Sequence, residues 1–177
     1  MKEIITELIS EEELNKRIAE MGAQISNDFA GKEIRLISIL KGGVMFSCEL
    51  AKRITVPVTL DFMQAQSYGG ETYSSGEVKI VKDLDMSIKD QHVLIAEDII
   101  DTGNTLVALS KTLMDRGAKS ISICTLLDKP SRRIHKKITA DYTGFSVPDK
   151  FVVGMGLDYD QKYRNLPYIG VISFEED

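Results

Sequence analysis

The sequence predicts an α/β fold, a twisted and mainly parallel sheet of about five strands flanked by helices on both faces. Two observations lead to this prediction. Short, almost continuously apolar segments alternate with amphipathic helical patterns, which is typical of a parallel sheet buried on both sides. The 177 residues also contain no internal repeat, low-complexity tract or linker-like change in composition, so we expect a single domain over residues 1–177.

The first part of the chain has the pattern of a helix, a strand and a second helix. Ser10 followed by Glu13 predicts a capping box at the start of the first helix. Apolar side chains then recur at helical spacing, at Leu14, Ile18, Met21 and Ile25. We expect this helix to end at Gly31. We expect IRLISIL to be a strand, Lys41-Gly42-Gly43 a turn and VMFSCELAKRI a helix.

The middle of the chain continues this alternation. VPVTLDFMQA and VKIVKDL are expected to be strands on either side of the glycine-rich and hydroxyl-rich SYGGETYSSGEV. HVLIAEDI is expected to be a buried strand, TLVALSKTLMDRG a helix that stops at Gly117, and SISICTLL a further strand. The last third is less regular, with FVVGMGL and YIGVISF as short strands between charged turns.

Composition narrows the classes of function. The net charge of −5 and the pI near 5.2 argue against non-specific binding to nucleic acid or membranes. The basic run RRIHKK at 132–137 is therefore interpreted as a solvated face or an oligomer contact. Two cysteines in apolar segments, Cys48 and Cys124, predict free buried thiols, and no secretory signal is recognisable, so we expect a cytoplasmic protein.

Three carboxylates in the central stretch VLIAEDIIDTGNTL suggest a ligand site. Glu97 and Asp98 end an apolar strand, and Asp101 opens the loop 101–105 that enters a helix. Loop amides and threonine hydroxyls can surround a phosphate, while adjacent carboxylates suit vicinal hydroxyls or the water shell of Mg²⁺. This chemistry predicts a sugar phosphate. The alternative, an ordinary turn with Asp101 or Thr102 as N-cap, leaves the other two acids unexplained.

This stretch resembles the phosphoribosyl-pyrophosphate (PRPP) motif of the type I phosphoribosyltransferases. Further motifs resemble those of the hypoxanthine-guanine phosphoribosyltransferases in particular: LKGG at 40–43, SYGG at 67–70, LLDKP at 126–130 and PDKFVVGMGLDYDQKYRNLPYIGVIS at 148–173. The resemblance extends over nearly the whole chain with the motifs in the same order. It implies an enzyme that transfers 5-phosphoribose from PRPP to hypoxanthine, and also to guanine, giving IMP or GMP and pyrophosphate.

The resemblance also implies roles for individual residues. Ribose hydroxyls would be bound by Glu97 and Asp98, and Asp101 would act as general base near purine N7. The ribose 5-phosphate would be held by the loop that consists of Asp101, Thr102, Gly103, Asn104 and Thr105. Pyrophosphate would be bound by Lys41, Gly42, Ser67, Tyr68 and Arg164, and the peptide bond before Lys41 is often cis in this family. Mg²⁺ is the expected ion, with Glu97, Asp98 and Asp158 as its candidate ligands.

The purine base would be bound by Lys129, Phe151, Val152 and Asp158. An ammonium donor at Lys129 would favour a 6-oxopurine over adenine. Without the resemblance, Phe151 and Val152 would be predicted as buried strand residues, Lys129 as a solvated lysine and Arg164 as a surface arginine. The resemblance further implies a small hood formed by about 145–177 with part of the N-terminus, and a mobile loop at about 67–78, which composition alone would also permit as a surface hairpin.

Two other functions stay open from the sequence. One is a phosphoribosyltransferase that prefers xanthine, because no side chain visibly reads the 2-position of the purine. The other is a PRPP-sensing regulatory protein without catalysis, although neither a basic face nor an added DNA-binding domain is apparent. We expect PRPP and a 6-oxopurine as small-molecule partners, no nucleic-acid or membrane partner, and a homodimer or homotetramer.

Overall fold

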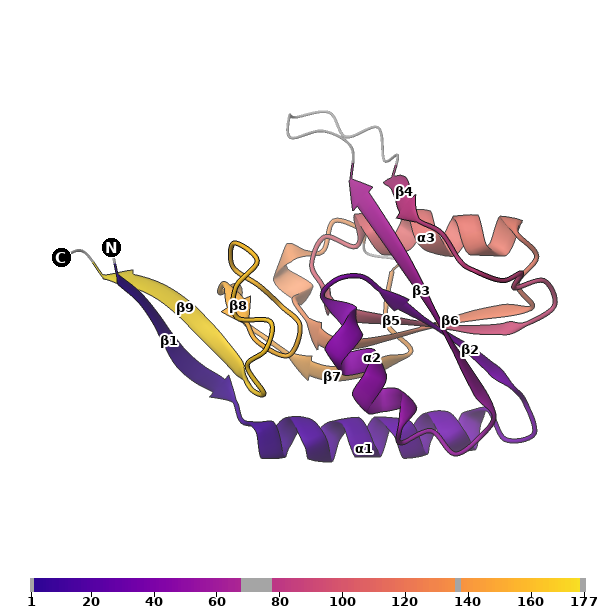
Figure 1. Cartoon of the computed structure of the whole chain (residues 1–177), viewed down its shortest axis with the longest axis horizontal. Coiled ribbons are helices and arrows are strands. Elements are labelled where there is room, and N and C mark those ends of the chain that lie inside the picture. The colour runs from indigo at the N-terminus through magenta and orange to yellow at the C-terminus, as the bar shows by residue number, and fades with distance from the viewer. Residues whose placement is uncertain (1, 68–77, 136–137, 176–177) are drawn as a thin grey trace.

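A six-stranded sheet forms the centre of the protein. The computed structural model describes residues 2–67, 78–135 and 138–175 (Figure 1). The strand order is β4-β3-β2-β5-β6-β7, and the strands are β2 (Ile34–Ile39), β3 (Val58–Ser67), β4 (Val78–Lys82), β5 (His92–Ile100), β6 (Ser120–Asp128) and β7 (Tyr142–Ser146). The five strands from β3 to β7 in this order run parallel, and β4 pairs antiparallel with β3 at the edge. The predicted α/β fold is confirmed, with six strands in the main sheet instead of about five.

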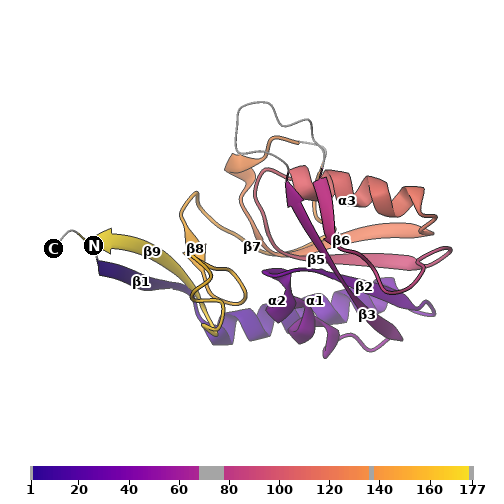
Figure 2. The same cartoon turned by 45° about the horizontal axis from the view of Figure 1, so that its top comes forward.

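Helices cover both faces of this sheet. α1 (Glu11–Asp28) and α2 (Gly43–Ala51) lie on one face, and α3 (Asn104–Asp115) lies on the other (Figure 2). Successive residues of β2 serve the two sides, since fully buried Leu36 packs in the α1 and α2 core and fully buried Ile37 packs in the α3 core. Strands buried on both faces read as continuous apolar runs, which is why the sequence identified them.

The first helix begins as predicted. The Ser10 hydroxyl accepts a hydrogen bond from the Glu13 amide, and the Glu13 carboxylate accepts one in return from the Ser10 amide. The apolar stripe of α1 is buried at every predicted position. The helix ends at Asp28, earlier than expected, and Gly31 takes a φ of +74° in the turn that follows.

A separate small sheet lies beside the main sheet, where the two ends of the chain meet (Figures 1 and 2). Its antiparallel order is β1-β9-β8, from β1 (Lys2–Ile9), β9 (Ile169–Glu175) and β8 (Val152–Val153). The sequence did not predict β1, nor β7 at the edge of the main sheet. β1 depends on a partner at the far end of the chain, with Glu3 opposite Phe174, so no local pattern identifies it.

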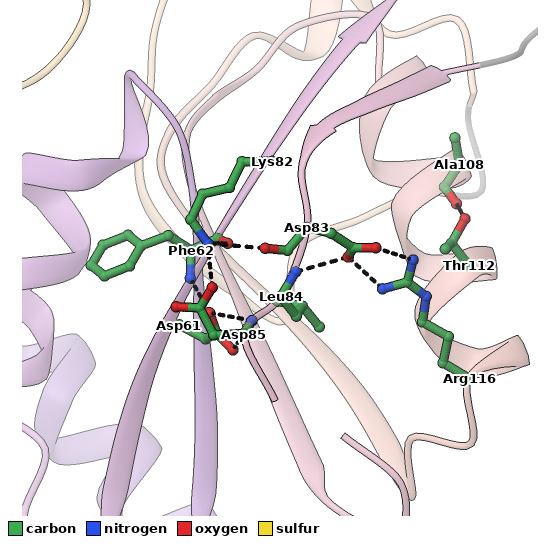
Figure 3. A network of polar contacts seen from close by, with 9 residues as sticks. All are labelled: Asp61, Phe62, Lys82, Asp83, Leu84, Asp85, Ala108, Thr112 and Arg116. Atoms are coloured by element: carbon green, nitrogen blue, oxygen red, sulfur yellow. Dashed lines mark hydrogen bonds and ion pairs between the residues drawn. The ribbon is translucent and has the colours of Figure 1, made fainter. Parts of the chain in front are cut away.

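A polar network ties β3 and β4 to α3 (Figure 3). The carboxylate of Asp61, only 3% exposed, accepts hydrogen bonds from the amides of Phe62 (2.8 Å) and Asp85 (3.2 Å). The guanidinium of Arg116 on α3 pairs with both carboxylate oxygens of Asp83, at 2.6 and 2.8 Å. These contacts anchor the segment that leaves β4, next to the two strands that border residues 68–77.

The two cysteines differ in environment. Cys124 in β6 is buried as predicted, but Cys48 is exposed on the outer side of α2, so the prediction of a buried thiol was wrong there. An apolar sequence neighbourhood does not determine which side of a helix a residue occupies. Of the helices that the structure describes, none combines the length and the apolar character needed to cross a membrane.

Candidate active site

A cavity of about 320 Å³ opens at the carboxyl ends of β2 and β5, beside the N-terminus of α3. This is the edge where open parallel sheets bind their ligands. Four separate parts of the chain line it. The predicted site residues among them are Lys41, Gly42, Glu97, Asp98, Asp101, Thr102, Gly103, Asn104, Thr105, Asp158 and Arg164. The structure therefore brings most of the predicted site together.

The acidic pair lies at the floor of this cavity, with Glu97 buried and Asp98 half-buried. Burial raises the pKa of Glu97 well above its ordinary value, and the neighbouring Asp98 charge raises it further. Burial also raises the pKa of Asp98, although hydrogen bonds and the Arg164 charge act in the opposite direction. Two carboxylates with raised pKa values are costly to keep charged. A cation or hydroxyl donors would relieve this cost, so the pair is suited to a metal-bound or sugar ligand.

The loop between β5 and α3 presents backbone amides to the same cavity. Gly103, with a φ of +87°, is the N-cap of α3 and offers no side chain to cap the first turn. The orphan amides of that turn and the helix dipole favour an anion. Thr102 accepts only a long bond, 3.4 Å, from the Asn104 amide. Neither Asp101 nor Thr102 is the N-cap, so the alternative of an ordinary capped turn is wrong.

Two arginines of the basic run hold this loop. Arg132 Nε lies 3.1 Å from the Asp101 carboxylate, and Arg133 Nε donates to the Asp101 carbonyl at 3.2 Å. The Arg133 guanidinium also pairs with Asp128. The interpretation of the run as a solvated face is therefore wrong for Arg133, whose side chain is largely buried, whereas Arg132 is exposed as that interpretation has it. Their role is invisible in the sequence because it depends on the path of the chain after β6.

The turn after β2 packs closely on the acidic pair. The Leu40–Lys41 peptide bond is cis, as the family resemblance led us to expect. A Cβ atom added to Gly42 would lie 1.6 Å from Asp98 Oδ2, so only glycine allows this approach. Gly156, with a φ of +101°, packs against Gly42 from the C-terminal part of the chain. A Cβ atom added to Gly156 would lie 2.0 Å from the Gly42 carbonyl oxygen.

Residues near the C-terminus complete the wall of the cavity. Arg164 pairs with Asp158 at 2.7 Å and donates to the Gly156 carbonyl at 2.7 Å. Gln161 joins the two candidate pyrophosphate cations, since its Oε1 accepts from Lys41 Nζ (3.2 Å) and Arg164 (3.3 Å). Sequence reasoning missed Gln161, whose only signal was its position within DQKYRNL between two predicted site residues.

A second hollow of about 160 Å³ adjoins the first and shares Asp98, Asp101 and Asp158 with it. Its other predicted residues are Lys129, Phe151 and Val152. Phe151 is 55% exposed, so the residue-only prediction of a buried strand residue was wrong for Phe151, while Val152 is buried as that prediction has it. An exposed aromatic face beside a hollow can stack on a flat ring. Phe151 also meets Tyr159, which sequence reasoning missed, edge to face at 5.6 Å.

Lys129 is a donor within this second hollow. Its side chain is 11% exposed, and its ammonium donates to the Lys150 carbonyl at 2.6 Å. An ammonium group has three donors, and the Asp149 carboxylate lies 4.0 Å away, so in the part of the chain that the structure describes two donors are available to a ligand. The prediction that Lys129 is a solvated lysine, made without the family resemblance, is therefore wrong.

Some predicted site residues are not placed in the cavity. Tyr68 and nearly all of the expected loop 67–78 lie outside the described residues, and Ser67 is the last residue of β3. Within 2–67, 78–135 and 138–175, no group of three or more histidine, cysteine or acidic side chains could hold a metal ion by itself. An ion here would therefore need further ligands from substrate or water.

Comparisons with known proteins agree with this geometry. Residues 5–160 match the family model described as the phosphoribosyl transferase domain. The chain is 53% identical over 165 residues to a hypoxanthine-guanine phosphoribosyltransferase of Bacillus subtilis, covering 93% of this chain and 91% of that protein. It is 49% identical over 174 residues to one of Streptococcus thermophilus, covering 98% and 96%.

A similar fold has been solved by crystallography. The structure of a hypoxanthine phosphoribosyltransferase from Staphylococcus aureus matches with a TM-score of 0.91 and 48% sequence identity. The match covers 95% of this chain and 91% of that one.

Proposed function

This chain belongs to the phosphoribosyltransferase family, and we propose that it is a purine-salvage enzyme that transfers the 5-phosphoribosyl group of PRPP to hypoxanthine and guanine, releasing pyrophosphate. The observation that carries this proposal is the meeting of two hollows at Asp98, Asp101 and Asp158. One hollow has the polar groups of a sugar-phosphate site, and the other has an aromatic face and an ammonium donor. The reacting bond would form where they join.

In the first hollow the chain would bind and orient PRPP. The loop 101–105 would hold the 5-phosphate through the amides at the start of α3. Glu97 and Asp98 would accept hydrogen bonds from the ribose hydroxyls. Lys41, Gly42 and Arg164 would bind the leaving pyrophosphate, with Ser67 and Tyr68 proposed to approach it from the loop 67–78.

Mg²⁺ fits the donor set of this hollow. Buried carboxylates whose pKa values are raised by burial favour a nearby divalent cation, and we propose Glu97, Asp98 and Asp158 as the residues that would face it. When bound, the ion would neutralise part of the negative charge of the leaving pyrophosphate.

In the second hollow the purine would lie against Phe151 and Val152, with Lys129 donating to its 6-oxo group. Asp101 would act as general base at purine N7. In the structure its carboxylate is 44% exposed and paired with Arg132, so it is reachable from the hollow. A carboxylate that accepts the ring proton would favour attack of the ring nitrogen on the sugar.

The remaining parts of the chain have supporting roles in this proposal. We propose that the small sheet and the segment from about 145 onwards form the hood over the base, and that the loop 67–78 closes on bound PRPP to exclude water. The enzyme would act in the cytoplasm as a homodimer or homotetramer.

The test is nucleotide synthesis by the purified protein. PRPP and Mg²⁺ are incubated with hypoxanthine, guanine, xanthine, adenine or uracil, and products are separated by chromatography. We expect IMP and GMP, and a decrease of about a hundredfold or more in kcat for Asp101→Asn, because one general base contributes about that much. Asp115→Asn on the exposed end of α3 is the control and should be as active as the wild type.

Two outcomes would contradict the proposal. If XMP is formed much faster than IMP and GMP, the preferred substrate is xanthine and not hypoxanthine or guanine. Binding of PRPP without nucleotide from any base would replace the enzyme by a PRPP-sensing protein.

A further inference from the structure

A third cavity lies at the edge of the sheet opposite the candidate active site. Its volume is about 310 Å³, and it is formed where β2, β5 and β6 begin. In Figure 1 these strand starts are at the far end of the molecule from the small sheet. The charged and titratable residues that line it are Lys32, Glu33, Arg35, Asp90, His92 and Lys119. None of these residues has a role in the proposed phosphoribosyl transfer.

Arg35 is the unusual member of this group. Its side chain lines the cavity although the residue is only 6% exposed in β2. Its Nε donates to Gln91 Oε1 at 2.9 Å, but among the described residues its two terminal amino groups have no hydrogen-bond partner and no carboxylate within 4.0 Å. These terminal amino groups are reached by solvent through the cavity, so they can donate to a ligand bound there. An anion in the cavity would complete its hydrogen bonds and its charge balance.

The other charged residues around the cavity also bear on whether it binds an anion. Lys32 and Lys119 contribute two exposed ammonium groups, of which that of Lys32 also lies 3.5 Å from the Asp28 carbonyl. The acids Glu33 and Asp90 are exposed as well, so solvent screens the lysines and the acids alike. His92 reports the local potential, since burial lowers its pKa and the charges of Lys119 and Lys32 lower it further. Three cationic and two acidic side chains line the cavity, so its lining has a net positive charge on a chain whose net charge is −5.

We propose that this cavity binds a phosphate dianion, either free or as the monoester end of a small metabolite. A guanidinium fork can bind two oxygens of one phosphate at once. The cations outnumber the acids at this hollow, which favours a doubly charged oxyanion over a singly charged carboxylate. This site is separate from the phosphate loop at residues 101–105 and does not depend on the proposed transferase activity.

The test uses the two histidines of the chain as separate reporters in proton NMR. His92 lines this cavity, and its Nδ1 lies 2.7 Å from Ser120 Oγ. His135 reports the candidate active site instead, because its amide donates to the Thr102 carbonyl at 3.3 Å. The variant His135→Gln assigns the two sets of ring resonances. Inorganic phosphate, ribose 5-phosphate and acetate are titrated separately.

We expect phosphate to shift the His92 resonances saturably, with a Kd on the order of 1 mM, and to raise the pKa of His92, because an anion stabilises the imidazolium. Arg35→Gln should weaken this response about tenfold, the loss expected for hydrogen bonds to a charged group. It should leave the His135 response unchanged. Lys119→Gln, at an exposed position, tests the site without altering a buried residue, and it should also weaken the His92 response. Lys111→Gln on α3 is the matched control and should have no effect.

Three outcomes would overturn the proposal. They are a phosphate response of His135 alone, an equal response of His92 to acetate, and an unchanged His92 response in both Arg35→Gln and Lys119→Gln. A larger response to ribose 5-phosphate than to phosphate would support the monoester, and the reverse would support the free ion.

Discussion

Two sets of buried acids in this protein face different surroundings. Asp61, 3% exposed in β3, accepts hydrogen bonds from two backbone amides. Glu97, 9% exposed in β5, lies beside Asp98, and burial raises the pKa of both. Two backbone amides donate to Asp61, whereas Asp98 accepts one, from Ile99 at 2.7 Å, and the pair in β5 faces an open cavity. The difference indicates that a buried acid satisfied by its own chain serves stability, and one short of donors serves a ligand.

The two cases should separate when each acid is replaced. Removing an acid that is hydrogen-bonded in the folded state leaves buried donors unpaired and costs stability. Removing an acid that is costly to keep charged relieves the folded state but deprives the ligand of its contact. The predictions below test this contrast by measuring activity and stability in the same variants.

The largest effect is expected for Asp98→Asn. We expect kcat/KM for nucleotide formation to fall by about a hundredfold, the size of effect that follows from misplacing a reactant. The thermal midpoint of the free protein at neutral pH should be unchanged or higher, because a carboxylate that resists ionisation has been removed. Steady-state kinetics and thermal unfolding of the same preparation measure both quantities. If Asp98→Asn loses both stability and activity, Asp98 stabilises the fold as Asp61 does, and the contrast between the two acids is wrong.

Asp61→Ala should have the opposite profile. The amides of Phe62 and Asp85 would lose their acceptor, and we expect the free energy of unfolding to fall by about 1–3 kcal/mol. Since Asp61 does not line the candidate active site, kcat/KM should stay within about twofold of the wild type. Urea denaturation and steady-state kinetics are the measurements.

Arg116→Gln is the control for that variant. It removes the ion pair with Asp83 in the same network (Figure 3). The two side chains are 35% and 50% exposed, so the loss should be below about 1 kcal/mol. If Asp61→Ala and Arg116→Gln lower the free energy of unfolding by equal amounts, the burial of Asp61 does not increase its contribution to stability.

A smaller effect is expected in the pH dependence of stability. Because the pKa values of Glu97 and Asp98 are raised in the folded state, that state holds more protons than the unfolded chain between the ordinary and the raised values. Stability contributed by these groups is present below the ordinary carboxyl pKa and is lost as pH rises through the raised one, by up to about 1.4 kcal/mol per pH unit per group.

The matched variant for this prediction is Glu97→Gln combined with Asp98→Asn. Its stability relative to the wild type should increase from pH 5 towards pH 8, as measured by urea denaturation without substrate. A difference that is constant over this range would show that the pair ionises normally in the folded protein.

Much of the main sheet and of the candidate site could be predicted from the sequence. The capping box of α1, its buried stripe and the strand-turn-helix units around Gly42 and Gly103 all follow from short-range rules. Glu97 and Asp98 were identifiable because charged residues at the end of an apolar strand need a reason. The residues named for PRPP in the central stretch and after β2 lie together in one cavity.

Other features depended on chain segments that meet only after folding. β1 pairs with β9 from the other end of the chain, Arg132 and Arg133 turn back onto the loop after β5, and Gln161 bridges Lys41 and Arg164. The exposure of Phe151 and of Cys48 likewise depends on which neighbours cover them. The sequence by itself determined the local periodicity, the helix start of α1 and the alternation of strands and helices along the chain from β2 to β6, because these depend on residues a few positions apart. The tertiary structure decided the contacts between distant segments, because their free energy depends on partners that no local pattern specifies.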